Sequence, residues 1–151
     1  ITDLINYAVS EFGRLDILVN NAGLQHVAPV DEFPVEKWDT LIAVILSSTF
    51  HASKAAIPIM KAQGSGYVLN VSSYFGGEKY LAVAYPNRAD YAASKSGQRA
   101  MVESMARYLG PEVQFNAIAP GPVDGDRLAG TGGTRRGRHA RSSAECPLRR
   151  S

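Results

Sequence analysis

Hydrophobic residues recur along this chain at two spacings, one typical of helices and one typical of buried strands. Between Leu4 and Phe12 they recur at helical spacing, and Gly13 predicts the end of that helix. Residues 16–20 form a short apolar run, which predicts a strand buried on both faces. A polar loop with prolines follows, and Pro34 suits the first turn of the next helix.

The alternation of helix and strand continues to about residue 118. Helical spacing predicts a long helix over residues 35–60, kinked near Pro58, and another helix over residues 89–109. Short apolar runs at 67–71 and 113–118 predict the second and third strands. Strands that alternate with helices are typical of α/β folds, so we predict a doubly wound parallel sheet.

Polar motifs come directly after each of the three predicted strands. Asn20-Asn-Ala-Gly23 follows the first strand, Ser72 and Ser73 follow the second, and Pro120-Gly121 follows the third. Ligands of doubly wound folds bind beyond the carboxyl ends of the strands, which lie at one edge of the sheet. The pattern therefore predicts one binding site built by these three loops.

Tyr91 and Lys95 stand four residues apart on the predicted helix 89–109, so they project from one face, one turn apart. A cation beside a phenol favours the phenolate and lowers the phenol pKa from its reference of about 10. A tyrosine so placed can exchange a proton with an alcohol oxygen, which a nearby serine hydroxyl can hold. The spacing alone is weak evidence, because about 0.2 such pairs arise by chance in a chain of this composition.

Four motifs follow one another in order: Asn-Asn-Ala-Gly at 20–23, Asn-x-Ser-Ser at 70–73, Tyr-x-x-x-Lys at 91–95 and Asn-Ala-Ile-x-Pro-Gly at 116–121. Together they resemble the motifs of the short-chain dehydrogenase/reductase family, over roughly residues 1–130. The resemblance implies a Rossmann-like fold and an oxidoreductase that uses NAD or NADP.

The resemblance also implies a role for each matching residue. Tyr91 would be the general acid/base, and Lys95 would tune Tyr91 and hold the nicotinamide ribose. Ser73 would orient the substrate carbonyl, with Ser72 as the less favoured candidate. A plain strand-to-loop turn is the alternative for the first motif, since Asn and Gly are ordinary turn residues. Cofactor contacts are implied for Asn20, Ala22, Gly23, Tyr91, Lys95, Pro120 and Gly121.

The chain departs from the family pattern in three ways. The glycine-rich turn Thr-Gly-x-x-x-Gly-x-Gly, which binds the dinucleotide pyrophosphate, does not occur in it. We therefore expect only the C-terminal part of the Rossmann-like domain, without the residue that selects NAD or NADP. Ile45 stands where the family has an asparagine that holds a relay water, and an isoleucine side chain cannot anchor water. The segment from Gly76 to Asn87 is predicted to be an insertion between the serine and the tyrosine.

Two groups within the family resemble parts of this chain more closely than the family as a whole does. Residues 18–60 resemble bacterial D-3-hydroxybutyrate dehydrogenases, in which the glutamine that matches Gln25 helps bind the substrate carboxylate. Arg88 stands where those enzymes have a lysine, and Phe75 where they have a histidine. Residues 64–132 resemble the reductase domain of bacterial malonyl-CoA reductase, which reduces malonic semialdehyde with NADPH. The candidate substrate-binding residues are Gln25, Ser73 and Arg88.

Composition and charge limit the other functions. The 151 residues are 45% hydrophobic, which is enough for the core of one domain. They contain no unbroken run of about eighteen apolar residues, so no membrane span is predicted. A single cysteine, Cys146, excludes an internal disulfide and favours a cytoplasmic location. We predict no metal site.

The net charge of +2 is unevenly distributed. Residues 125–151 hold seven arginines against Asp126 and Glu145, so this tail carries +5 and residues 1–124 carry −3. A basic tail can bind nucleic acid, but no aromatic residues are interleaved with these arginines. The Gly/Arg-rich composition favours a disordered or non-native tail after a partial domain over residues 1–124.

Two hypotheses follow from the sequence. The first is an enzyme that interconverts a short 3-oxo acid, of the malonic semialdehyde or acetoacetate type, and its 3-hydroxy acid. The second is a non-catalytic relative that serves as an oligomerising module. In either case the resemblance implies a homo-oligomer assembled through the helices predicted at 35–60 and 89–109.

Overall fold

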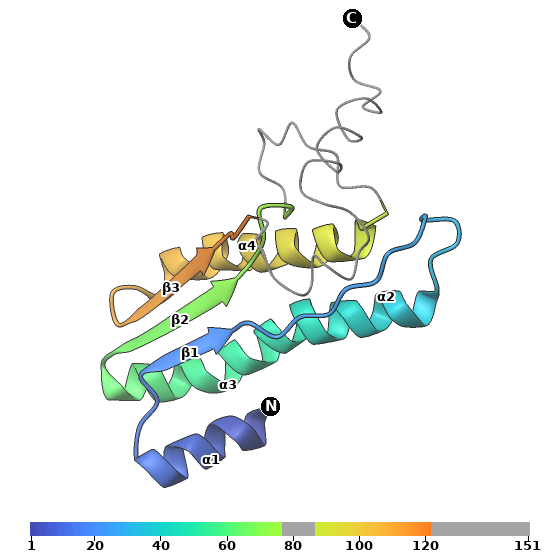
Figure 1. The fold of residues 1–151 in the computed structure, drawn as a ribbon. Helices are drawn as coiled ribbons and strands as arrows, with labels where there is room; N and C mark the ends of the chain where they lie inside the picture. Colours follow the sequence, from blue (N-terminus) through green and yellow to red (C-terminus); the bar gives the residue numbers. More distant parts are fainter. Residues whose placement is uncertain (77–86, 122–151) are drawn as a thin grey trace, which may run out of the picture.

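The computed structural model describes residues 1–76 and 87–121, which form a parallel sheet with helices packed on it (Figure 1). Most of the predicted insertion and the whole predicted tail lie outside the described residues. In chain order the elements are α1 (Thr2–Phe12), β1 (Ile17–Asn20), α2 (Val35–Leu41), the π-helix η1 (Ile42–Ser47), α3 (Ser48–Gln63), β2 (Gly66–Val71), α4 (Ala89–Leu109) and β3 (Val113–Ile118).

The sheet has the order β1-β2-β3, and both pairs of neighbouring strands are parallel. Ile17 pairs with Tyr67 across the first interface, and Val68 pairs with Phe115 across the second. The chain crosses from each strand to the next through helices, as parallel strands require. The α/β parallel sheet predicted from the sequence is confirmed.

Two glycines end helices, and the first does so at the predicted position. Gly13 follows α1 with φ of 77°, and Gly64 follows α3 with φ of 74°. Both conformations are left-handed, which glycine adopts without the steric cost of a side chain. The Gly13 amide donates to the Val9 carbonyl at 2.8 Å and so closes the last turn of α1.

The long helix predicted over residues 35–60 forms as three consecutive segments. Regular helix gives way to η1, which contains Ile45, and resumes at Ser48. The helix α3 continues through Pro58, and the predicted kink there stays a prediction. Short π segments are frequent at functional sites, and η1 packs against α4.

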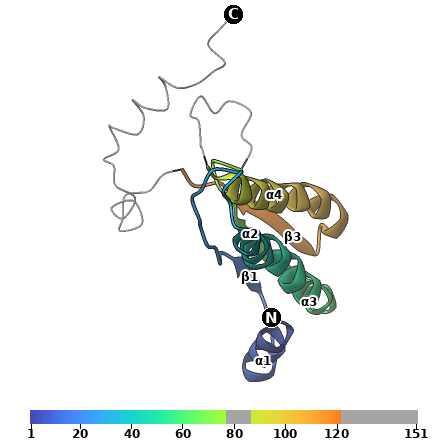
Figure 2. The same cartoon turned by 90° about the vertical axis from the view of Figure 1, so that its right-hand side faces the viewer.

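One face of the sheet packs against α3 and α4. Val68, Val113 and Phe115 point to this face and are buried in the core. Helix α1 lies beside α3, at a distance from α4 in both views (Figures 1 and 2), and it adds Ile5 to the same core. The helices α3 and α4 contribute Ala52, Ala56, Met60 and Leu109.

The opposite face of the sheet is not covered by the residues that the structure describes, so the prediction that β1 is buried on both faces is wrong for this part of the chain. Ile17 and Val19 point away from the helices and are 61% and 51% exposed. Ile118 on β3 is also exposed. An apolar run shows that a strand is suited to burial, but it does not show whether a second layer is present.

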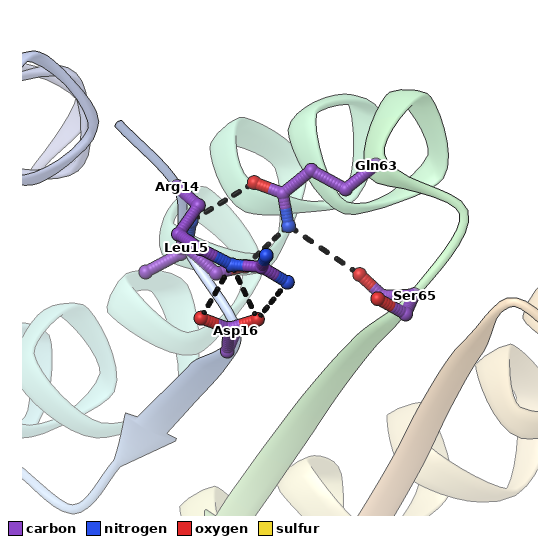
Figure 3. Close-up of polar contacts among 5 residues, drawn as sticks. All are labelled: Arg14, Leu15, Asp16, Gln63 and Ser65. Atoms are coloured by element: carbon purple, nitrogen blue, oxygen red, sulfur yellow. Dashed lines mark hydrogen bonds and ion pairs between the residues drawn. The ribbon is translucent and has the colours of Figure 1, made fainter. Parts of the chain in front are cut away.

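At the amino end of the sheet, one side chain joins three segments (Figure 3). The Gln63 amide accepts from the Leu15 amide and donates to the Leu15 carbonyl, both at 2.9 Å, and it also donates to the Ser65 carbonyl at 3.4 Å. Beside it Arg14 and Asp16 form an exposed ion pair, and this carboxylate raises the pKa of Arg14. Gln63 thus fixes the entry of both β1 and β2.

The sequence predicted no membrane span, yet the helical stretch Val35–Gln63 is long and apolar enough to cross a membrane by length and composition. Its buried residues lie against the sheet and α4. Core helices of globular proteins have the same length, composition and packing, so this feature alone does not indicate a membrane protein.

Candidate active site

The carboxyl ends of the three strands are joined by a row of amides. The Asn20 side chain donates to the Asn70 side-chain oxygen at 2.9 Å, and the Asn70 side chain donates to the Asn116 carbonyl at 3.2 Å. Asn70 is fully buried, and such a side chain requires hydrogen-bond partners. These hydrogen bonds therefore hold the three strands together at the edge of the sheet where the ligand site is predicted.

Beyond the paired strands, the loops after β2 and β3 remain hydrogen-bonded to each other. The Ser72 amide donates to the Ile118 carbonyl at 2.8 Å, and the Tyr74 amide donates to the Pro120 carbonyl at 3.0 Å. These two bonds flank Ser73, whose hydroxyl accepts from the Phe75 amide at 3.2 Å. The predicted serine is therefore held by a fixed backbone next to Pro120.

Lys95 on α4 is 3% exposed and faces the end of β2. Its Nζ donates to the Val71 carbonyl at 2.6 Å and to Gln98 Oε1 at 3.1 Å. The Ser72 hydroxyl donates to the Lys95 carbonyl at 2.9 Å, which joins the serine loop to the same turn of helix. An ammonium that is removed from water requires such acceptors, because an uncompensated buried charge is very costly.

Gly76 allows the loop after Ser73 to approach α4 closely. A Cβ at this position would lie 3.0 Å from the Lys95 carbonyl carbon and Cβ, and 3.0 Å from the Ser73 carbonyl. The Gly76 amide donates to that same carbonyl at 2.8 Å. A side chain at this position would therefore require the loop or the helix to shift by a few tenths of an ångström.

Tyr91 lies one turn before Lys95, as the sequence spacing predicts. The distance from Lys95 Nζ to the centroid of the Tyr91 ring is 5.8 Å, which is within the range of a cation–π contact. Tyr91 is half-buried, whereas Lys95 is buried. The structure thus brings the tyrosine, the lysine and the serine loop to one region beyond the strands.

The two predicted carboxylate-binding side chains meet across a separation of 63 residues. Arg88, the residue before α4, donates from Nη1 to Gln25 Oε1 at 2.8 Å. This bond joins the loop after β1 to the start of the helix that carries Tyr91. A guanidinium presents several donors in a planar fork, the geometry that suits a carboxylate.

The remaining predicted cofactor residues lie in the loops at the same edge. Ala22 and Gly23 follow β1, and Gly121 follows Pro120. Among the described residues, a Cβ at Gly121 would meet no atom within 4 Å, and one at Gly23 would meet only the Asn21 carbonyl at 3.8 Å. The backbone at both glycines is therefore open to a ligand.

Sequence reasoning missed Gln98, whose buried side chain lies next to Lys95. Its Nε2 donates to the Ile45 carbonyl at 3.0 Å and to Thr49 Oγ1 at 2.7 Å. The available signal was its position three residues after Lys95, which places both side chains on one helix face. Ile45 is buried in η1, and the predicted loss of a relay water there stays a prediction.

Comparison with known proteins identifies the family of this chain. The model of the family described as short chain dehydrogenase matches residues 1–134. The chain is 42% identical over 124 residues to a D-beta-hydroxybutyrate dehydrogenase of Rhizobium meliloti and 43% identical to one of Cupriavidus necator. Each match covers 82% of this chain and 46% of the relative, so the chain spans about half the length of the curated relatives it matches. The chain belongs to the short-chain dehydrogenase family.

Two solved structures are similar as well. The NADP-bound C-domain of a bacterial malonyl-CoA reductase is 65% identical with a TM-score of 0.77, over 87% of this chain and 20% of that one. A short chain dehydrogenase from Mycobacterium smegmatis is 33% identical with a TM-score of 0.73, over 81% of this chain and 49% of the other. Both resemblances named from the sequence, to hydroxybutyrate dehydrogenases and to malonyl-CoA reductase, are confirmed.

Proposed function

We propose that this protein is an oxidoreductase that uses NAD or NADP to interconvert a short 3-oxo acid and its 3-hydroxy acid. The observation that carries the proposal is the cluster of Tyr91, buried Lys95 and the Ser73 loop at the carboxyl edge of the sheet, next to the Arg88–Gln25 pair. The cluster provides acid/base chemistry, and the pair provides a place for a carboxylate.

The donors at this edge fit a nicotinamide cofactor. The backbone is open at Gly23 and Gly121, and Lys95 brings an ammonium to the end of β2. Asn20, Ala22, Gly23, Pro120 and Gly121 would line the cofactor, while Tyr91 and Lys95 would contact its ribose. When bound, the nicotinamide would supply or accept the hydride.

In the proposed reaction, each protein group acts on the carbonyl oxygen of the substrate. The Ser73 hydroxyl donates a hydrogen bond to this oxygen and orients it. Tyr91 gives its phenolic proton to the same oxygen during reduction and takes it back during oxidation. The Lys95 ammonium lies 5.8 Å from the centroid of the Tyr91 ring and so places a positive charge beside the proton donor.

The carboxylate of the substrate would bind Arg88. Gln25 already accepts one N–H of this guanidinium at 2.8 Å and so restricts its orientation. Relatives support a short acid, since one is named as a dehydrogenase of D-beta-hydroxybutyrate and another as malonyl-CoA reductase. The NADP in the latter structure favours NADP over NAD for this chain.

The first test is Tyr91→Phe in the complete protein, assayed by NADPH oxidation with malonic semialdehyde and acetoacetate. This change removes the proton donor and keeps the ring, so kcat should fall about 10²–10⁴-fold while the Kd for NADPH barely changes. Near-full activity in this variant would show that the active site lies elsewhere.

The second test concerns the substrate class. Arg88→Ala should raise KM for 3-oxo acids by about tenfold, because a hydrogen-bonded charge pair is lost, and it should spare neutral ketones. Arg88→Lys keeps the charge and serves as the matched variant, with a smaller rise in KM. Equal effects on acids and neutral ketones would rule out Arg88 as the carboxylate ligand.

A further inference from the structure

We propose that Gln98 is a positioning residue that fixes the Lys95 ammonium in the active site. The inference rests on the proposed function in one respect, namely that Lys95 holds the nicotinamide ribose. The Lys95 ammonium donates from Nζ to the Val71 carbonyl at 2.6 Å and to Gln98 Oε1 at 3.1 Å. The first acceptor is backbone and the second belongs to a side chain, so a substitution at Gln98 tests what this acceptor contributes to the position of the ammonium.

The orientation of the Gln98 amide follows from its surroundings. Its Nε2 faces two acceptors, the Ile45 carbonyl at 3.0 Å and Thr49 Oγ1 at 2.7 Å. The Thr49 hydroxyl donates to the Ile45 carbonyl at 2.8 Å, so its oxygen is left to accept from Gln98. A reversed amide would set its oxygen against the Ile45 carbonyl and its NH₂ against the ammonium. The oxygen must therefore face Lys95.

Burial makes this arrangement rigid. Gln98 and Thr49 are each 1% exposed, and Ile45 is fully buried. Water therefore does not compete for the amide, and its loss would leave buried groups without partners. The π-helix η1 supplies the anchoring carbonyl, which links the irregular turn of the long helix to the catalytic lysine on α4.

Two variants of the complete protein separate positioning from packing. Gln98→Leu and Gln98→Glu both remove the donors to Ile45 and Thr49, so both should lower thermal stability. Only Gln98→Leu also removes the oxygen that faces Lys95. Ser94→Ala is the control, because Ser94 is buried one turn earlier and its hydroxyl donates to the Asp90 carbonyl within the same helix.

Two measurements are made on each variant. One is the Kd for NADPH, from the fluorescence of the nucleotide. The other uses the cofactor-free protein: the rate at which acetic acid N-hydroxysuccinimide ester acetylates Lys95, from peptide mass spectrometry. Gln98→Leu should raise both by about tenfold, the effect of losing one hydrogen bond to a charged group. Gln98→Glu and Ser94→Ala should stay within about threefold of the unmodified protein.

The proposal is overturned if Gln98→Leu leaves both quantities unchanged, or if Gln98→Leu and Gln98→Glu change them equally. The latter result would assign Gln98 to packing alone. A protein that binds NADPH but reduces no 3-oxo acid would overturn the proposed substrate, and the two measurements would still decide the role of Gln98. If no nicotinamide nucleotide binds, the acetylation rate alone decides it.

Discussion

On the face of the sheet that meets α3 and α4, Val68 and Val113 are fully buried and Phe115 is nearly so. On the opposite face, Ile17, Val19 and Ile118 are about half exposed or more. Both faces are apolar, yet the described residues cover only one. The same strands are therefore packed against helices on one face and exposed on the other.

The difference shows which part of the fold builds the site. The hydrogen bonds that join Lys95, Gln98, the serine loop and η1 lie on the helix-covered side or at the carboxyl edge. Doubly wound sheets carry helices on both faces, so the apolar open face is suited to a second layer. The arrangement of the candidate catalytic side chains therefore depends on the covered face.

The largest expected change in stability comes from Val68→Ala, at the centre of the covered face. Val68 is fully buried beside Met60 and Phe115 in the core cluster, so the variant loses apolar burial and leaves a cavity. We expect the free energy of unfolding to fall by about 2–3 kcal/mol. Urea unfolding followed by the fluorescence of Trp38, the single tryptophan, measures it. A loss below about 0.5 kcal/mol would contradict the packing described here.

Much of the fold could be predicted because local rules determine it. Helix ends at Gly13 and Gly64 follow from their left-handed backbone, and the strands follow from short apolar runs. The open face of β1 could not be predicted, since Ile17 and Val19 are as apolar as buried residues. The π-helix η1 was also missed, because proline is the sequence signal for an irregular helix and Pro58 lies elsewhere.

The site was predictable where its residues lie on regular elements. Tyr91 and Lys95 lie close together because they are four residues apart on one helix, so the spacing in the sequence predicts their contact. The family resemblance named Gln25 and Arg88 as substrate-binding residues, but their contact was not predicted, since no local rule joins two loops so distant in sequence. Gln98 was missed because its partners Ile45 and Thr49 belong to another helix, and only the tertiary structure brings them together.

A smaller change in the free energy of unfolding, of opposite sign, tests whether water reaches the core between the sheet and its helices. The Ser53 hydroxyl on α3 is fully buried and has no hydrogen-bond partner among the described residues. Ser53→Ala should therefore raise the free energy of unfolding by about 1 kcal/mol, because an unsatisfied polar group is removed and alanine favours the helix. Ser94→Ala, which breaks a hydrogen bond to Asp90, should bring no such gain. A loss of stability in Ser53→Ala would mean that the hydroxyl is hydrated.

The smallest effect is expected on the open face, from Val19→Ala. Val19 and Val68 are the same residue type on neighbouring strands, but Val19 is 51% exposed, so truncation removes little buried surface. We expect a loss of about 0.5 kcal/mol, mostly from the lower strand propensity of alanine. Val19→Thr keeps the β-branch and should be close to neutral, whereas Val68→Thr should destabilise by burying a hydroxyl. If Val19→Ala instead costs as much as Val68→Ala, another surface covers this face in solution, and the contrast between the two faces disappears.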